Sequence, residues 1–524
     1  MDGSRSFHVN DFDTSEVHET LTSDELGSAL QVLPPRIYLD ALVESYLSGP
    51  NYQYYILYPP SFSKDYTAWW DDRVRGRTPD RAMTCLLLRI CACATLAATD
   101  TLRNMLETEL GENIAQLSKR YHIAARTLSS SIGAGKGGLL QVQQLFLTSW
   151  WLKGDGQFID SWHSLAASIH EAQELGLHDK DIYQPVDEFE EEMRRRVWCI
   201  LYVCDRLFYS LLSRPRIIEA TTTTPLDLPD LHLGTAGKGQ DWPSPITHVV
   251  LLCQLFQPLS AEFVSCKNRD LPPNEIVKLQ RIVSNWLAAC PTIYKTTDKP
   301  RDDEPPYIQL QRWTIQVPAY LLMLQALKPY LAATPGQGLR DSETHRRLQA
   351  AAVECALSLA DSSTRLAEAT IVYVTNFHTA VFTLFDGIAV LCSSILHDSD
   401  GSLPQRAQVI EAVGRGVQTM KRLSEISRTA ITAYRVLSQL VRRLGLPCSD
   451  RGGIESAEAD GLIPRNPAQR TTIGPDKSSG LALESPELHG LDGDESESAS
   501  VRDLQLGQLG EMGMWNWGPL GFDL

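Results

Sequence analysis

Metal chemistry needs several His, Cys, Asp or Glu side chains in one place, and the chain offers few such groupings. Cys91 and Cys93 are separated by one residue on an apolar segment, so they cannot bind an ion as a Cys-x2-Cys pair does. His163, His170 and His178 lie on or just after one expected helix, without an obvious set of Cys, Asp or Glu beside them. We interpret these histidines as cap or core residues. The sequence therefore predicts no metal-binding residue.

A glycine-rich stretch at 133–138 has some of the composition of a phosphate-binding loop. That motif needs a glycine four intervening residues before its Gly-Lys pair, and the position before Gly135 and Lys136 is Ser130. Gly137 stands where a Ser or Thr would hold magnesium, and no strand precedes the stretch. We therefore predict a flexible loop between helices and no cofactor-binding residue.

Acidic pairs on helices could hold magnesium in an all-helical lyase or terpene cyclase. Asp71 and Asp72 lack a third acid, and the acids at 302–304 lie between prolines in an expected loop. We keep this enzyme class as an alternative, but the sequence provides no catalytic residue for it. The main prediction is a protein that is not an enzyme.

The elements that would position any site are helices. Helices are expected over 110–130, over 308–331 with an interruption at Pro318, over 348–367 and over 406–444, and a packed loop is expected over 51–63.

The clearest two helices lie between 158 and 212. Apolar residues of the first recur at helical spacing, and Gly176 follows as its expected end. Asp187 is a candidate cap for the second helix. This helix begins with a run of glutamates, and three arginines follow at 194–196. Three acid–base pairs at i, i+4 are expected on an exposed face: Glu190 with Arg194, Glu191 with Arg195 and Glu192 with Arg196. The helix is expected to end at Arg214-Pro215.

In their order and spacing, segments 162–178, 190–198, 202–206, 214–215 and 227–229 resemble the middle regulatory domain of the fungal zinc-cluster transcription factors. The resemblance extends upstream over 121–126 and 139–152, and more loosely over 58–70. It spans 33 to about 331, and more vaguely continues to 446. Ser213 stands where the family usually has glycine before Arg-Pro, which concerns only the local turn. The resemblance implies an all-α regulatory domain of a nuclear transcription regulator.

The zinc cluster of that family needs six cysteines in two Cys-x2-Cys-x6-Cys blocks, because each ion takes four thiolates and two are shared. The chain has 11 cysteines and no Cys-x2-Cys. Since the regulatory domain is expected from residue 33, we expect the DNA-binding module to be missing from this sequence. The formal net charge of -16 also disfavours binding to a polyanion. We predict that this chain alone binds neither zinc nor DNA.

Two further features of the helical region have both a structural and a functional interpretation. Asp205 and Arg206 are embedded in an apolar helix, where we expect an ion pair that joins helices, with ligand sensing as the alternative. Tryptophan pairs at 69–70 and 150–151 are expected in the core, with a small-molecule pocket as the alternative. No effector can be named. Apolar runs at 85–98 and 379–396 contain Arg89 and Asp386, so we expect buried helices and no membrane span.

Composition divides the chain into three parts. Residues 1–32 are predicted to be a disordered acidic arm, 33–446 the helical regulatory domain with its best-matched part at 33–331, and 447–524 a disordered acidic tail. Residues 451–524 contain thirteen acids and five bases. The tail ends in an aromatic segment, 512–524, that is a candidate activation segment for contact with the transcription machinery. Docking of these aromatics on the helical body is the alternative.

The resemblance implies regulation of a fungal metabolic pathway, such as a secondary-metabolite gene cluster. A second hypothesis is a regulatory decoy that forms heterodimers with a DNA-binding homologue, and a homodimer is also open. Sequence alone does not separate activator from decoy.

Overall fold

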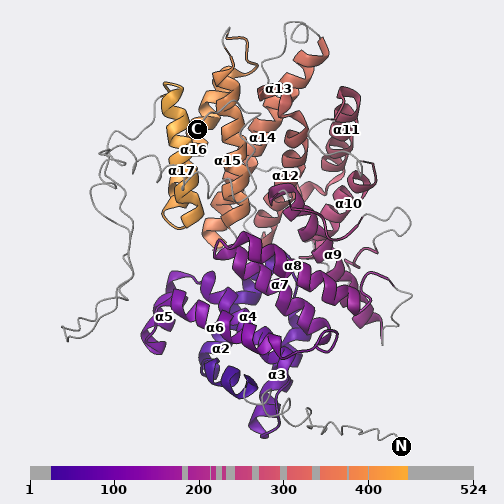
Figure 1. Cartoon of the computed structure of the whole chain (residues 1–524), viewed down its shortest axis with the longest axis vertical. Helices are drawn as coiled ribbons and strands as arrows, with labels where there is room; N and C mark the ends of the chain where they lie inside the picture. Colours follow the sequence, from indigo (N-terminus) through magenta and orange to yellow (C-terminus); the bar gives the residue numbers. More distant parts are fainter. Residues whose placement is uncertain are drawn as a thin grey trace, which may run out of the picture.

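The computed structural model describes residues 25–179, 187–212, 214–219, 227–231, 242–262, 271–295, 304–332, 343–373, 377–398 and 401–446. None of these residues lies in a β-strand, and helices form nearly all of the body in Figure 1. The predicted all-α fold is confirmed. The acidic tail and the first part of the N-terminal arm lie outside the described residues.

The helices follow one another with short connections. In chain order they are α2 (Arg36–Ser48), η1 (Pro50–Gln53), α3 (Pro59–Val74), α4 (Arg81–Leu96), α5 (Asp100–Leu110), α6 (Ile114–Ser130), α7 (Gly138–Gly154), α8 (Phe158–Glu174), α9 (Glu188–Leu212), α10 (Thr247–Glu262), α11 (Pro273–Ala289), η2 (Thr292–Tyr294), α12 (Pro306–Leu327), α13 (Pro329–Ala332), α14 (Glu343–Tyr373), α15 (Phe377–Leu396), α16 (Arg406–Ser424) and α17 (Arg428–Arg443).

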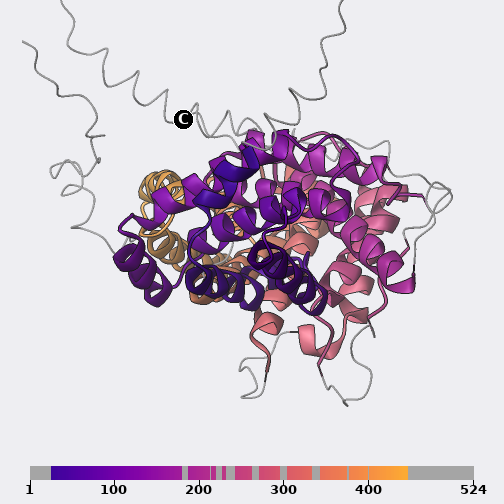
Figure 2. The ribbon, with the colours of Figure 1, turned by 90° about the horizontal axis from the view of Figure 1, so that it is seen from below.

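The helices are arranged in two groups that meet at α9. In Figure 1, α2 to α8 form the lower half and α10 to α17 the upper half. Helix α9 packs against α7 and α8 on one side and against α10, α12 and α15 on the other. Seen from below in Figure 2, the N-terminal helices lie in front of the C-terminal ones. One hydrophobic core extends through both groups, from Leu26 to Val441.

Helix α4 is the centre of the lower group. Asp80 caps it by accepting a 2.7 Å hydrogen bond from the Met83 N–H. Every residue from Ala82 to Thr95 is buried, because α2, α6 and α7 all pack around this helix. Arg89 is therefore placed inside the lower group.

The predicted end of the N-terminal arm at residue 32 was wrong. Residues 25–32 are helical, and Leu26, Ala29 and Leu33 are buried in the core. Their apolar spacing was too short a signal to separate this helix from the acidic residues before it.

Two predictions for the lower group were wrong in their boundaries. The expected loop over 51–63 contains η1 and the first turn of α3, where Pro59 occupies the first helical position. The helix expected over 110–130 begins only at Ile114, because the preceding helix α5 ends at Leu110 and Gly111 has a φ of 66°. Asn113 then caps α6 by accepting from the Ala115 N–H at 2.9 Å.

Three helix boundaries in the upper group also differ from expectation. Helix α12 continues through Pro318 and ends before Pro329, since a proline removes only one intrahelical hydrogen bond and both sides of this helix are buried. Helix α14 extends to Tyr373, beyond the predicted end at 367. The helix expected over 406–444 breaks at 425–427, which allows both α16 and α17 to pack against α15.

Helix α15 is the one described helix that is long and apolar enough to cross a membrane by itself, over His378–Leu396. Its most apolar window is 83% buried inside the molecule. This burial confirms the prediction of a core helix.

Candidate functional site

The turn between α8 and α9 forms as the sequence predicts. Gly176 has a φ of 71°, and its N–H donates to the Gln173 carbonyl at 2.9 Å. The Leu177 N–H donates to the Ala172 carbonyl at 2.9 Å, so two of the last carbonyls of α8 are satisfied. Asp187 caps α9 by accepting from the Glu190 N–H at 2.7 Å. Both the helix end and the helix start are confirmed.

All three predicted acid–base pairs are present on the first turns of α9. The pairs are Glu190 with Arg194 at 2.9 Å, Glu191 with Arg195 at 2.9 Å and Glu192 with Arg196 at 2.7 Å. The prediction that this face is exposed was wrong. The side chains of Glu192 and Arg196 are only 5% and 4% exposed.

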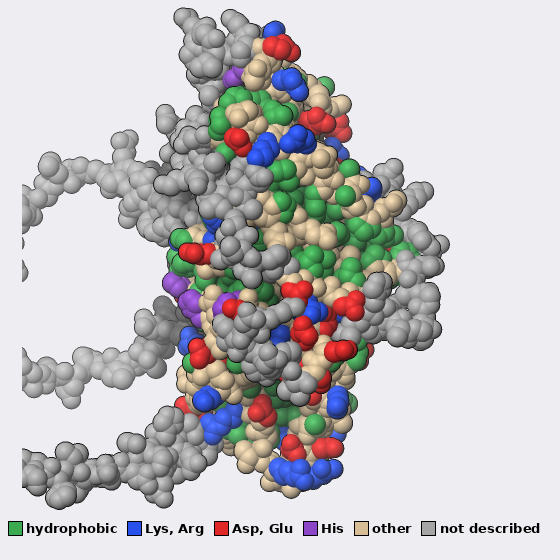
Figure 3. All heavy atoms as spheres, turned by 90° about the vertical axis from the view of Figure 1, so that its right-hand side faces the viewer, with side chains coloured by type: hydrophobic (Ala, Val, Ile, Leu, Met, Phe, Trp, Pro, Cys, Tyr) green, Lys and Arg blue, Asp and Glu red, His purple; other side chains and the backbone are tan. Residues whose placement is uncertain are grey.

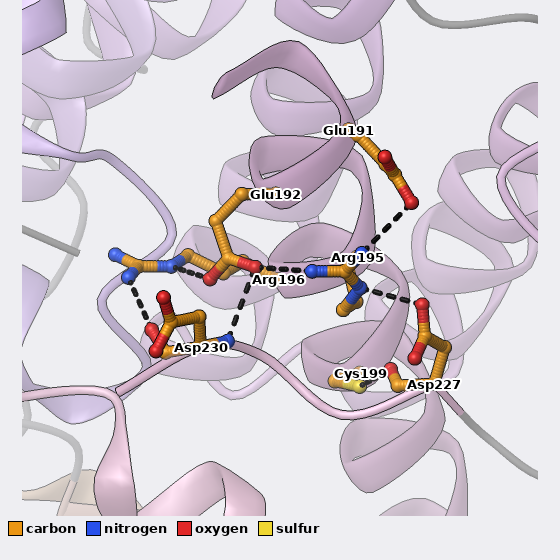
Figure 4. A network of polar contacts seen from close by, with 7 residues as sticks. All are labelled: Glu191, Glu192, Arg195, Arg196, Cys199, Asp227 and Asp230. Carbon is orange, nitrogen blue, oxygen red and sulfur yellow. Dashed lines mark hydrogen bonds and ion pairs between the residues drawn. The ribbon is translucent and has the colours of Figure 1, made fainter. Parts of the chain in front are cut away.

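Burial of these charges is due to residues 227–231, which lie across the start of α9 in Figure 4. Glu192 accepts hydrogen bonds from Arg196 at 2.7 Å, from Arg195 at 2.7 Å and from the Asp230 N–H at 3.1 Å. Arg196 in turn donates to the Asp230 carbonyl at 3.0 Å. Glu192 is therefore the carboxylate at the centre of the network.

Arg195 connects the same network to Asp227. Its Nε donates to the Asp227 carboxylate at 2.6 Å, and the Cys199 thiol donates to the Asp227 carbonyl at 3.4 Å. Partial burial acts to lower the pKa of Arg195, but the Asp227 and Glu192 carboxylates outweigh it and raise that pKa. Arg195 therefore stays charged, and the network fixes residues 227–231 to the helix.

Asp205 and Arg206 form a second buried charged group on α9. Arg206 donates a hydrogen bond to Asp205 at 3.1 Å. The Asp205 side chain is 1% exposed and the Arg206 side chain is 4% exposed. Asp205 also accepts from the Ile217 and Ile218 N–H groups, and Arg206 donates to the Ile218 carbonyl at 2.8 Å. The predicted ion pair is confirmed, but it fixes the loop after Pro215 and does not join two helices. Ser213 lies outside the described residues.

The other residues singled out from the sequence are mostly structural. Trp69, Trp150 and Trp151 are buried, whereas Trp70 is only partly buried. Stretch 133–138 is a loop between α6 and α7, and the Gly135 N–H donates to the Glu171 carboxylate at 2.9 Å. His163, His170 and His178 are all exposed, so none of the three is the core residue that the sequence allowed. No group of three His, Cys, Asp or Glu side chains suited to a metal ion occurs among the described residues.

Arg89 of α4 and His122 of α6 form a buried polar group that was not predicted from the sequence. Their side chains lie 2.7 Å apart, and both residues are buried. The signal in the sequence is the single arginine inside the apolar run at 85–98, since a charge in such a run is rarely buried without a partner.

Charges on the described surface are mixed. On the face in Figure 3, Lys and Arg side chains alternate with Asp and Glu side chains around apolar areas. The described residues of this face form no continuous basic surface of the kind that binds phosphates.

Comparison with known proteins identifies the family. Residues 43–327 match the fungal specific transcription factor domain. The probable transcription factor sol4 of Alternaria solani is 29% identical over 236 residues, which cover 44% of this chain and 41% of that protein. The transcription factor xilB of Penicillium rubens is 24% identical over 231 residues, covering 40% of this chain and 33% of that protein. The equisetin cluster transcription factor eqxF of Fusarium heterosporum is 22% identical over 479 residues, covering 84% of this chain and 66% of that protein.

The chain thus spans between 33% and 66% of the length of these relatives. The domain match includes α4, the network on α9 and all of α12, and it covers more than half of the 524 residues. The chain belongs to the family of proteins with a fungal specific transcription factor domain.

Proposed function

We propose that this protein regulates transcription in a fungal nucleus and that its target genes form a secondary-metabolite cluster. The observation that carries the proposal is the family match over 43–327, which includes the charged network of α9. A relative that aligns with 84% of the chain is named as the transcription factor of the equisetin cluster. This likeness supports the choice of gene class.

The helical domain and the acidic tail have separate roles in this proposal. The domain receives a signal or a partner, and the tail contacts the transcription machinery. Residues 451–524 lie outside the described residues, so the proposal rests on their thirteen acids, five bases and terminal aromatics. Such acids keep aromatic side chains in water until a partner groove binds them.

A fusion experiment tests the tail. Residues 451–524 are joined to an unrelated DNA-binding domain, and a reporter gene with sites for that domain is measured. We expect activation that is lost when Trp515, Trp517 and Phe522 are changed to Ala. A matched fusion in which Leu481, Leu483 and Leu488 are changed to Ala tests whether apolar residues elsewhere in the tail matter equally. A silent wild-type fusion would contradict the activating role.

A regulatory decoy is the second candidate. The family match covers the helical domain, and a decoy needs only this domain. A decoy would form heterodimers with a DNA-binding homologue through the helical domain and lower reporter output. Co-expression with such a homologue distinguishes the two: the decoy reduces transcription from the homologue's promoter, and the activator increases it.

A further inference from the structure

A groove of about 870 Å³ lies over α4 in the lower group of helices. Three helices supply one stripe of side chains each: α6 contributes Lys119, His122 and Arg126, α7 contributes Gln141, Thr148 and Trp151, and α8 contributes its residues around His163. Helices α6 and α7 both pack on α4, so Arg89 of α4 reaches the groove from below. The volume falls within the usual range of about 300–1,000 Å³ for small-molecule sites.

Arg89 is a buried cation without a carboxylate partner among the described residues. It is 1% exposed, and its hydrogen bonds are to Gln144 Oε1 at 3.4 Å, His122 Nδ1 at 2.7 Å and the His122 carbonyl at 3.1 Å. All three acceptors are neutral, and Nη2 has no hydrogen bond to a described residue. Three other arginines of the described part are buried to this degree: Arg196, Arg206 and Arg312. Each of them has a carboxylate within 3.2 Å. A buried charge is normally neutralised by a partner, so a negative group is missing here.

His122 adds a second donor to the same place. Arg89 can only donate hydrogen bonds, so the Nδ1 atom of His122 must accept and its proton is on Nε2. Burial, Arg89 and Arg126 lower the pKa of His122 to about 3, so the ring is neutral at physiological pH. The ring stacks on Trp151 with centroids 3.8 Å apart, which fixes its orientation.

The groove also contains an unused acceptor. Gln141 is 5% exposed, and its Oε1 has no hydrogen-bond partner. Its amide nitrogen is 3.5 Å from the Ser129 hydroxyl, so the side chain is held while its oxygen is free to accept. Leaving such a buried acceptor without a donor is unfavourable. A ligand hydroxyl or N–H would satisfy it.

Charge varies along the groove. Arg126 and Lys119 of α6 are exposed at the rim close to Arg89, whereas Asp155 and Asp160 line the end formed by the α7–α8 turn. A negative group is therefore attracted to the end near α4 and α6 and repelled from the other end. Trp151, Leu145 and Leu152 provide the apolar surface between them.

We propose that this groove binds a small organic anion, whose carboxylate pairs with Arg89 and whose flat apolar body carries a hydroxyl or N–H group for Gln141. The rim cations Lys119 and Arg126 assist capture of the anion. The site goes beyond the proposed function: binding of the anion is a property of the helical body, and its measurement does not depend on any transcriptional readout.

Isothermal titration calorimetry of the full chain tests the site with 6-hydroxy-2-naphthoate as the probe. We expect saturable binding of one probe per chain and no comparable binding of its methyl ester, which has the same ring and hydroxyl but no charge. Arg89→Met should weaken binding by about tenfold or more, since a charge-assisted hydrogen bond is lost. Lys64→Gln, which removes an exposed cation on α3 outside the groove, should leave binding unchanged.

A second variant tests the site even if Arg89→Met does not fold. The double variant Lys119→Gln with Arg126→Gln alters only exposed side chains at the rim. It should weaken binding of the probe severalfold. Equal binding of the acid and its ester, unchanged binding by the Arg89 variant, or the absence of saturable binding to the wild-type chain would each overturn the proposal. If the anion binds but no genes respond to the protein, the site stands and the proposed function fails.

Discussion

Removal of the Glu192 carboxylate is the sharpest test of the charged network on α9. Glu192→Ala leaves the Arg196 guanidinium, which is 4% exposed, without the carboxylate that lies 2.7 Å from it. The same change removes the acceptor of the Asp230 N–H and one of the acceptors of Arg195. Breaking a buried ion pair from one side typically costs about 3–5 kcal/mol. For a helical body of this size we expect the melting temperature to fall by roughly 3–6 °C.

Glu191→Ala is the matched control, because Glu191 precedes Glu192 and pairs with Arg195 at a more exposed position. Its side chain is 37% exposed, and an exposed pair contributes about 1 kcal/mol or less. Differential scanning calorimetry of both purified variants makes the comparison. Equal losses of stability in the two variants, or no loss in either, would refute the conclusion that 227–231 and Glu192 form a buried network.

Three further predictions concern other parts of the fold. Gly416→Ala should destabilise the protein by about 1–3 kcal/mol, because a Cβ there would lie 2.3 Å from Ile388 Cδ1; Gly414→Ala on the same helix meets open space and should stabilise by about 0.5–1 kcal/mol, as measured by chemical denaturation. Asp205→Ala should cost about 3–5 kcal/mol and make the loop at 214–219 sensitive to proteolysis, since Arg206 loses its partner and the loop loses two hydrogen bonds; a stable variant would contradict this structural role. Burial lowers the pKa of Lys153 from 10.5 to about 8, so the folded chain disfavours its charge below pH 8 and this penalty disappears as the pH rises towards 10.5. Lys153→Met should therefore stabilise the protein by up to about 3 kcal/mol at pH 7, with a gain that shrinks between pH 8 and 10 in thermal denaturation; a gain independent of pH would count against the shifted pKa.

Local signals in the sequence predicted the elements around α9 well. The start of this helix depends on Asp187 and the glutamates after it, and its preceding turn depends on Gly176, so both follow from nearest neighbours along the chain. The spacing of the acid–base pairs on α9 gave no information about whether these side chains are buried. Glu192 and Arg196 are covered by residues more than 30 positions away, and spacing along a helix does not reveal what packs on it.

Long-range packing also explains what the sequence did not show elsewhere. The apolar period continues through 425–427 without glycine or proline, so the break between α16 and α17 depends on how both helices cover α15. Arg89 could be identified from the sequence as a charge in an apolar helix. Its relation to His122 and Gln141 could not, because these residues come from three helices whose arrangement only the fold determines.

The most direct test of the central claim is the transcript profile of the fungus with this gene deleted and with it overexpressed. If the protein regulates a secondary-metabolite cluster, a contiguous set of biosynthetic genes changes in opposite directions in the two strains. An activator lowers these transcripts on deletion, and a decoy raises them. Unchanged transcripts in both strains, with the protein present in the nucleus of the overexpressing strain, would contradict the account.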